Sequence, residues 1–445
     1  MEKQTIEQVL RNIDDIQSSV REATSMIKHS TPITNYADAP QQDIRDLIII
    51  GAITGKNLLL NGSAGIAKTH LGLTALAGLY GNENTTCLQI DPSLEKENLF
   101  NIDGGKLQNG LLSEAIIDSK LITCPGVLLD EINRAPGAIR NVLQGYLNNQ
   151  AITPAGGEIR EIGVELSNGD RYQFKIGTCN EGKKYGESTF KMDPAFRRRW
   201  QIELPIDLFS PTDYDLNERR KARRIGSGLF VPKSVGVQDK VFATYSFISS
   251  LDFNPLAEEF ISYLGRMNNC SNPKSFFKTK NEKGFSIDRC NGCHARGLAG
   301  TQNFCGNVYA PESPQEDIEA VAKGFALIRN HHEAAVNGNL PETIEVSFED
   351  VLQAFPFVCS TKMSFDSAWL EKYFNSGEPF EATRALGINI EQKIKSKIKK
   401  LEELMVKKEF TQDELEIIKK YSLEDPWSFG LRDCDNNPVV YKSLR

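Results

Sequence analysis

The sequence contains no apolar run of about 18 residues, the length that a membrane-spanning helix needs. Its N-terminus also lacks the basic, apolar and small-residue succession of a secretory signal peptide. We therefore expect a cytoplasmic protein without a membrane partner. The nine cysteines lie at scattered spacings, which argues against a disulfide framework in a chain of 445 residues.

The chain has no large excess of charge of one sign. Its net charge is −7, so the chain as a whole is not a strong binder of polyanions. The basic segment at residues 219–224 is a local exception, which we interpret as a solvated helix face. Hydrophobic residues make up 40% and charged residues 25% of the chain, which is typical of a globular protein with a sizeable core. The length predicts two or three domains.

Residues 1–30 are predicted to form an amphipathic helix. Gln17 interrupts its apolar stripe, which favours a helix docked on the body of the protein over a coiled-coil partner helix. The apolar residues that recur near helical spacing are Ile6, Leu10, Ile13, Val20 and Ile27.

Between about residues 40 and 205, short apolar runs alternate with helical patterns. This alternation predicts an α/β fold with a mostly parallel sheet that is covered on both faces. A polar, glycine-containing stretch at residues 151–173 predicts a hairpin inserted before the fourth strand. The expected strands are residues 57–61, 87–91, 126–130, 174–178 and 201–204. The expected helices include residues 69–80, 138–148, 255–268, 314–332, 348–355 and 390–407.

A glycine-rich segment, Gly-Ser-Ala-Gly-Ile-Ala-Lys-Thr at residues 62–69, lies between the first strand and the following helix. Such a turn exposes backbone amides at a helix N-terminus, where they bind phosphate together with the helix dipole. Lys68 would reach the outer phosphates, and the Thr69 hydroxyl would ligate Mg²⁺. An ordinary strand-to-helix turn would not explain Lys-Thr at this place. The residues expected to contact the nucleotide here are Gly62, Ser63, Ala64, Gly65, Ile66, Ala67, Lys68, Thr69 and His70.

Two adjacent carboxylates, Asp130 and Glu131, end the apolar run of residues 127–129. Buried carboxylates are costly unless a cation or a water network uses them. We expect Asp130 to hold the shell of Mg²⁺ and Glu131 to polarise the attacking water. The apolar run before the two acids argues against the alternative, an acidic surface loop.

Two further polar segments follow in the chain. Asn180 ends the fourth strand and could orient the attacking water, although a lone asparagine there is more often a turn residue. Three arginines at residues 197–199 precede Trp200. One of them could stabilise transition-state charge on a neighbouring subunit's γ-phosphate. A basic surface cluster is the alternative.

Together, these segments resemble those of the AAA+ ATPases, in particular the MoxR/McrB-like, dynein-related branch. The segment ending Gly-Ile-Ala-Lys-Thr at Thr69 looks like the MoxR variant, in which alanine replaces the last glycine of the P-loop. Residues 129–136, Leu-Asp-Glu-Ile-Asn-Arg-Ala-Pro, are close to the branch's Asp-Glu-Ile-Asn-Arg-Ala signature. Residues 193–200, Asp-Pro-Ala-Phe-Arg-Arg-Arg-Trp, look like the McrB-type arginine-finger segment. The resemblance covers roughly residues 40–210.

This resemblance implies a P-loop α/β core with a five-stranded parallel sheet in the order 5-1-4-3-2, an α-helical lid, and a ring that usually has six subunits. Asn180 would be the first sensor, Arg199 the arginine finger with Arg198 as the next choice, and Arg296 the second sensor. Hairpins at about residues 101–115 and 151–173 would face the pore. The expected parts are an N-terminal helix at 1–39, the nucleotide-binding core at 40–210, the lid at 211–365 with a cysteine-containing insertion at about 271–312, and a helical extension at 366–445.

A cysteine cluster lies in the expected insertion. Cys290 and Cys293 form a Cys-x₂-Cys pair, which Cys270 and Cys305 could complete as a tetrahedral zinc site in a loop-rich segment. Free thiols are the alternative. The same segment also matches a c-type haem attachment motif, which sits badly with the lid of an ATPase.

The motifs and the resemblance favour Mg²⁺-dependent ATP hydrolysis in a ring that remodels or activates a partner protein. MoxR-like relatives often work with a protein that contains a von Willebrand A domain. The alternative is a McrB-like NTPase, using ATP or GTP, that drives a nuclease acting on DNA. A third interpretation is a nucleotide-gated scaffold with little turnover. The acidic balance favours a protein partner over nucleic acid.

Overall fold

The computed structural model divides into two compact units. The first comprises residues 1–251 and 323–344, and the second comprises residues 252–322 and 345–445. The structure describes residues 3–25, 43–93, 119–148, 161–180, 194–209, 234–254, 314–360, 362–365, 367–374 and 379–405, with a few short stretches between these ranges.

A five-stranded sheet forms the centre of the first unit. Its strands lie in the order β2-β5-β8-β1-β9, and all neighbouring pairs are parallel. Counted along the chain and followed from the other edge, this order is 5-1-4-3-2, so the predicted fold class is confirmed. The strands are β1 (Leu58–Asn61), β2 (Thr85–Gln89), β5 (Gly126–Asp130), β8 (Phe174–Cys179) and β9 (Ile202–Pro205).

The central strands are buried on both faces because helices cover both sides of the sheet. All residues of β1, β5 and β8 are buried, as expected for a parallel sheet between two helical layers. On one face, Val127 and Leu129 pack in a core with Leu143 of α7 (Gly137–Leu147) and with Trp200. Gly177 of β8 permits this packing, because a Cβ there would lie 2.5 Å from the Trp200 ring.

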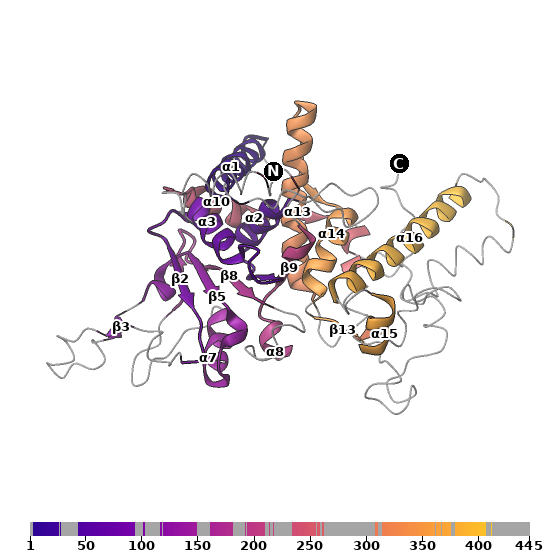
Figure 1. The fold of residues 1–445 in the computed structure, drawn as a ribbon. Coiled ribbons are helices and arrows are strands. Elements are labelled where there is room, and N and C mark those ends of the chain that lie inside the picture. Colours follow the sequence, from indigo (N-terminus) through magenta and orange to yellow (C-terminus); the bar gives the residue numbers. More distant parts are fainter. Residues whose placement is uncertain are drawn as a thin grey trace. The chain divides into compact units, whose positions relative to one another are not determined.

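The other face of the sheet is covered by two helices, α2 (Ile44–Thr54) and α3 (Lys68–Tyr80). Gly72 brings α3 against the sheet, since a Cβ at this position would lie 2.7 Å from Leu128. Two further helices, α1 (Lys3–Ala23) and α10 (Gln238–Ile248), contact each other and both α2 and α3 (Figure 1). The N-terminal helix therefore belongs to the layer that contains α3.

Helix α1 buries its predicted apolar stripe, and Gln17, the polar residue within that stripe, lies on the same docked side. Gln17 is itself buried, and its Nε2 donates a hydrogen bond of 2.8 Å to Oδ1 of Asp46 in α2. The docked side of α1 thus contains a polar residue with a specific partner. A sequence pattern cannot show this, since the partner lies 29 positions away.

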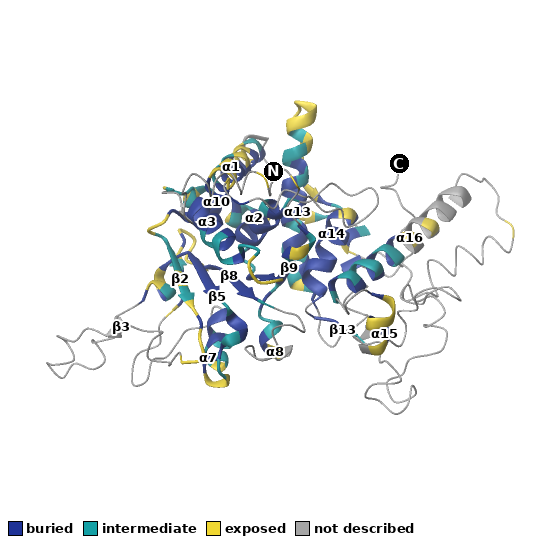
Figure 2. Ribbon diagram, in the orientation of Figure 1, coloured by how far each residue is buried: buried dark blue, intermediate teal, exposed yellow. Residues whose placement is uncertain are grey.

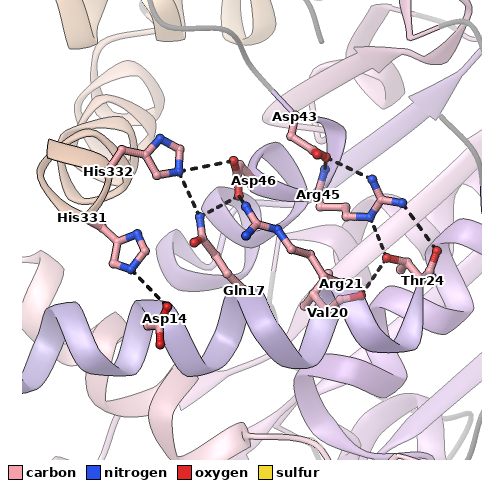
Figure 3. A network of polar contacts seen from close by, with 10 residues as sticks. All are labelled: Asp14, Gln17, Val20, Arg21, Thr24, Asp43, Arg45, Asp46, His331 and His332. Carbon is pink, nitrogen blue, oxygen red and sulfur yellow. Dashed lines mark hydrogen bonds and ion pairs between the residues drawn. The ribbon is translucent and has the colours of Figure 1, made fainter. Parts of the chain in front are cut away.

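Asp46 is the centre of a polar network that joins α1, α2 and α13 (Gln315–Asn337) (Figure 3). Arg21 of α1 approaches Asp46 Oδ1 to 3.8 Å, and His332 of α13 approaches Oδ2 to 3.9 Å. Burial raises the pKa of Asp46 above its ordinary value of 3.8, and nearby Asp43 raises it further, while His332, Arg21 and Gln17 lower it. The network therefore compensates only part of the cost of burying this carboxylate.

Replacing Gln17 by leucine should lower the free energy of unfolding by about 1–3 kcal/mol at neutral pH, because a buried carboxylate would lose a hydrogen-bond donor. Denaturant unfolding and hydrogen exchange of α1 would measure the loss. The raised pKa means that Asp46 binds a proton more readily in the folded state. Stability linked to this group therefore falls as the pH rises above 3.8. The effect of Gln17→Leu should shrink towards and below pH 3.8, where Asp46 is protonated.

The matched control is Gln8→Leu, on the same helix. Gln8 is exposed and donates to Asn12 one turn away, so this change should alter stability by less than about 0.5 kcal/mol. An equal loss of unfolding free energy in the two variants would show that the hydrogen bond from Gln17 to Asp46 does not stabilise the fold.

Two short antiparallel pairs lie in the hairpin regions expected from the sequence. Strands β6 (Val164–Glu165) and β7 (Arg171–Tyr172) form a hairpin directly before β8. Strands β3 (Asn101–Ile102) and β4 (Ile116–Ile117) pair in the same way. Each region contains an antiparallel strand pair, and its orientation towards a pore remains a prediction.

The second unit is mainly helical. It contains the first part of α13, together with α14 (Phe348–Cys359), α15 (Ser367–Tyr373) and α16 (Pro379–Met405). Helix α14 begins with a capping box, in which Ser347 and Asp350 satisfy each other's backbone amides. This helix is almost entirely buried and contacts α16 (Figure 2).

Short strand pairs complete the described part of the second unit. Strand β10 (Asp252–Phe253) pairs in parallel with β12 (Glu345–Val346), and β11 (Val308–Tyr309) is antiparallel to β13 (Ser364–Phe365). Throughout the described part of both units, no helix combines the length and apolarity needed to cross a bilayer.

Candidate functional site

The loop from Gly62 to Ala67 joins β1 to α3 and contains three residues with positive φ: Gly62, Gly65 and Ala67. Ala67, at φ 67° and ψ 29°, immediately precedes the first helical residue. A left-handed conformation costs an alanine roughly 1–2 kcal/mol, so packing around the loop must impose it. A glycine-containing loop of this kind before a helix N-terminus is suited to binding phosphate through its backbone amides and the helix dipole.

Lys68 and Asn180, 112 positions apart in the sequence, meet at this loop. The Lys68 Nζ donates hydrogen bonds to the carbonyl oxygens of Gly62, at 2.9 Å, and Ser63, at 2.7 Å. It also donates to Oδ1 of Asn180 at 2.7 Å. Burial lowers the pKa of Lys68, and nearby groups that include Asp207 oppose this shift. The ammonium group thus joins the loop to Asn180.

Asp130 receives two hydroxyl donors at the end of β5. The Oγ1 atoms of Thr69 and Thr178 donate to Oδ1 of Asp130 at 2.7 and 2.6 Å. A threonine hydroxyl and a carboxylate are oxygen ligands of the kind that Mg²⁺ prefers. Their proximity beside a phosphate-binding loop makes Thr69 and Asp130 a fitting pair for Mg²⁺ bound with a nucleotide.

Glu131 has a left-handed backbone conformation, with φ 57° and ψ 44°. Its amide donates to Oγ1 of Thr178 at 3.0 Å, and its carboxylate pairs with Arg134 at 3.1 Å. Conformations of this kind cost a non-glycine residue about 1–3 kcal/mol and are concentrated at functional sites. The strained backbone of Glu131 therefore turns its side chain away from the direction of β5.

Asn180 is fixed through both its backbone and its side chain. Its carbonyl oxygen accepts a hydrogen bond of 2.8 Å from Nδ2 of Asn133, while its side chain accepts the bond from Lys68. Asn133 belongs to the short helix η2 (Ile132–Arg134), which follows the two acids. The polar segments expected from the sequence thus contact one another at the carboxyl edge of the sheet.

The three arginines have different surroundings. Arg197, in α8 (Pro194–Arg197), pairs with the buried carboxylate of Glu203 at 2.6 Å, so it has a structural partner. Arg199 contributes its carbonyl oxygen to Asn57 Nδ2 at 3.2 Å. Among the described residues, no group accepts a hydrogen bond from its buried Nε. Arg198 lies between them and is half-buried.

The structure also places several residues in the site that the sequence did not suggest. Asp207, in η4 (Ile206–Leu208), accepts hydrogen bonds from the backbone amide and the hydroxyl of Ser63, at 2.9 and 3.2 Å. Thr178 and Asn133 hold the acids and Asn180. Asp207 and Ser63 are 144 positions apart, so a spacing pattern could not link them. Thr178 ends the expected fourth strand two residues before Asn180, and this closeness to a predicted site residue was the available signal.

Several expected site residues lie outside the described residues. They are Arg296 and the four candidate zinc ligands, Cys270, Cys290, Cys293 and Cys305. In the part that the structure describes, no three His, Cys, Asp or Glu side chains gather as they would around a metal ion. His70, which was expected to contact the nucleotide, lies on α3, and burial lowers the pKa of its imidazole.

Comparison with known proteins matches a family model for an AAA domain of the dynein-related subfamily to residues 57–200. A solved structure described as a "putative ATPase" from Cytophaga hutchinsonii is similar, with a TM-score of 0.58 and 15% sequence identity. The match covers 87% of this chain and 96% of that chain, and at this identity it shows a shared fold. Among the curated proteins, none matches this chain.

Proposed function

We propose that residues 57–200, which match a family model for an AAA domain of the dynein-related subfamily, bind and hydrolyse ATP with Mg²⁺, and that the chain acts as a subunit of a ring. One observation carries the proposal. Lys68, Thr69, Asp130 and Asn180, from three different strand ends, are hydrogen-bonded around one phosphate-binding loop. An apolar core would gain nothing from such a cluster, and each member has a chemical use in phosphoryl transfer.

Binding begins with the loop amides and Lys68. The ammonium group now donates to two carbonyl oxygens of its own loop, and it can donate instead to the outer phosphates. The Asp207 carboxylate would give up the Ser63 amide to a phosphate oxygen. Bound Mg²⁺, held through Thr69 and Asp130, would neutralise charge on the phosphates.

Hydrolysis requires a water molecule aligned with the γ-phosphate. Glu131 supplies the carboxylate that orients and polarises this water, and Asn180 supplies an amide beside it. Arg199 completes the site of the neighbouring subunit. Two observations support the choice of Arg199 over Arg197. Arg197 is already paired with Glu203, whereas the Nε of Arg199 has no hydrogen-bond acceptor among the described residues.

We infer a partner protein rather than nucleic acid as the object of this cycle. The net charge of −7 disfavours general attraction to a polyanion. A ring of six subunits, a lid and a von Willebrand A-domain companion are parts of this proposal that rest on the resemblance to MoxR-like proteins. The alternatives are a McrB-like NTPase that drives a nuclease on DNA, and a scaffold that binds nucleotide with little turnover.

Turnover assays with ATP and GTP, each with and without DNA, separate these functions. Turnover of ATP that DNA does not change supports the proposal. A preference for GTP, or a strong stimulation by DNA, supports the McrB-like alternative. Tight Mg²⁺-dependent binding without measurable turnover by the assembled ring supports the scaffold.

Replacing Lys68 by alanine should weaken ATP binding by about 10–100-fold, because a charged hydrogen bond to phosphate contributes about 1.5–3 kcal/mol. Turnover should fall with it. Titration with a fluorescent ATP analogue measures the dissociation constant. Lys120→Ala is the matched control, since Lys120 is exposed and donates to the carbonyl oxygen of Glu83. Unchanged affinity in Lys68→Ala would remove Lys68 from the phosphate site.

A further inference from the structure

Thr178 touches both acidic residues of the site from the neighbouring strand. It lies near the end of β8, is 1% exposed, and follows Gly177, which is paired in register with Leu129 of β5. Its hydroxyl donates to Oδ1 of Asp130 at 2.6 Å and accepts the amide of Glu131 at 3.0 Å. A hydroxyl has one proton and two lone pairs, so it makes both bonds at once.

The bond to Asp130 holds a carboxylate that also accepts from Thr69. Thr69 would bind a cation through a lone pair of its hydroxyl oxygen. The hydrogen bond from Thr178, which comes from a different element, would still hold the orientation of the Asp130 carboxylate. Groups that orient metal ligands in this way typically contribute about 10–100-fold to metal affinity or activity.

The bond from the Glu131 amide acts on the second acid. Glu131 needs its left-handed backbone to leave the line of β5, and this conformation is costly for a side chain with a Cβ. The Thr178 oxygen is the acceptor for the amide of that strained residue. Removal of the hydroxyl would leave the amide without this acceptor and free the backbone to relax.

We propose that Thr178 is a positioning residue that sets Asp130 and Glu131 relative to each other through one hydroxyl. It acts through the two acids and does not itself touch the reacting atoms. The inference rests on the proposed function, in which Asp130 belongs to the Mg²⁺ shell and Glu131 orients the attacking water. It adds a residue of β8 to the determinants of Mg²⁺ use.

The test compares Thr178→Val with Thr178→Ser in the full chain. Valine keeps the shape and removes the hydroxyl, so turnover at saturating Mg²⁺ should fall by about 10–100-fold and the half-saturating Mg²⁺ concentration should rise by about tenfold. The KM for ATP at saturating Mg²⁺ should stay within about twofold, since the phosphate loop is intact. Serine keeps the hydroxyl and should restore both quantities to within about threefold of the original chain.

A matched control removes a buried threonine hydroxyl elsewhere in the same unit. Thr244 of α10 is fully buried, and its hydroxyl donates to the carbonyl oxygen of Lys240 at 2.8 Å. Thr244→Val should cost stability and leave the Mg²⁺ midpoint unchanged. A purely structural role for Thr178 would make the two valine variants alike. If Thr178→Val does not fold, Thr178→Ala tests the same midpoint without the added methyl groups.

Binding of a fluorescent ATP analogue over a Mg²⁺ titration gives a readout that does not need turnover. A raised Mg²⁺ midpoint in Thr178→Val supports the role of Thr178 even if the original chain does not hydrolyse ATP. In that case the proposed ATPase function is wrong, but the inference about Thr178 stands. A normal midpoint with normal turnover overturns the role of Thr178 and leaves the ATPase intact. Failure of serine to restore the midpoint also overturns it, as does nucleotide binding that is independent of Mg²⁺.

Discussion

Glu131→Gln should retain ATP binding within about twofold and lose turnover by about 10²–10⁴-fold, the usual contribution of a positioned general base. Glutamine has nearly the same shape and can keep the backbone bond to Thr178, but it cannot take a proton from water. Single-turnover hydrolysis and binding of a fluorescent ATP analogue would measure the two effects separately.

The control for this change is Glu83→Gln, which neutralises an exposed carboxylate outside the site. It should leave both binding and turnover as they are. Normal hydrolysis by Glu131→Gln would disprove the assigned mechanism. Loss of binding together with turnover would show that Glu131 supports the fold of the loop rather than the reaction.

Arg199→Ala should lower turnover by about 10³–10⁵-fold if Arg199 serves a neighbouring subunit in the way of the best-studied arginine fingers. Its own P-loop and acids would remain intact. Mixing Arg199→Ala with Glu131→Gln subunits should therefore recover part of the turnover. In mixed rings, some complete acidic sites face an intact Arg199 from the next subunit. Steady-state ATPase rates over a range of mixing ratios measure this recovery.

Arg11→Ala is the matched control, because Arg11 lies on α1 with its side chain 69% exposed and pairs with Glu7 one turn away. It should change neither rate nor recovery. If the mixture stays as inactive as its components, Arg199 acts within its own subunit or supports the structure. Full activity of Arg199→Ala alone would move the role to Arg198.

The sequence predicted the sheet well where strands are buried and poorly where they are not. The apolar runs of β1, β5 and β8 mark their positions because both faces of these strands contact helices. Strand β2 lies at the sheet edge with half-exposed residues, so nothing apolar marks its start. Its observed span, Thr85–Gln89, begins and ends two residues before the prediction.

Helix α2 shows a second limit of pattern reading. Ten of its residues are buried, so apolar side chains surround the helix and leave no periodic face. The polar partners within it are also hidden from spacing arguments. Asp46 bonds to Gln17 from a different helix, and only folding brings the two together.

The candidate site divides in the same way. Lys68, Thr69, Asp130, Glu131 and Asn180 were expected together, because short motifs at strand ends converge at one edge of a parallel sheet. Asp207 and Thr178 were not singled out, since a single hydroxyl within a strand or a single carboxylate after one has no distinctive pattern. Their roles depend on register and on contacts between distant segments.

Gly177 and Trp200 together give the site a mechanical property. The missing side chain at Gly177 lets the Trp200 ring lie directly against β8, where even one methyl group would clash. Close-packed interiors transmit displacement because they have little free volume to absorb it. Trp200 follows Arg199, and Thr178 follows Gly177. In the proposed ring, a pull on the arginine segment by an adjacent subunit would press on the strand that orients this subunit's own acids, and this packing would couple successive sites.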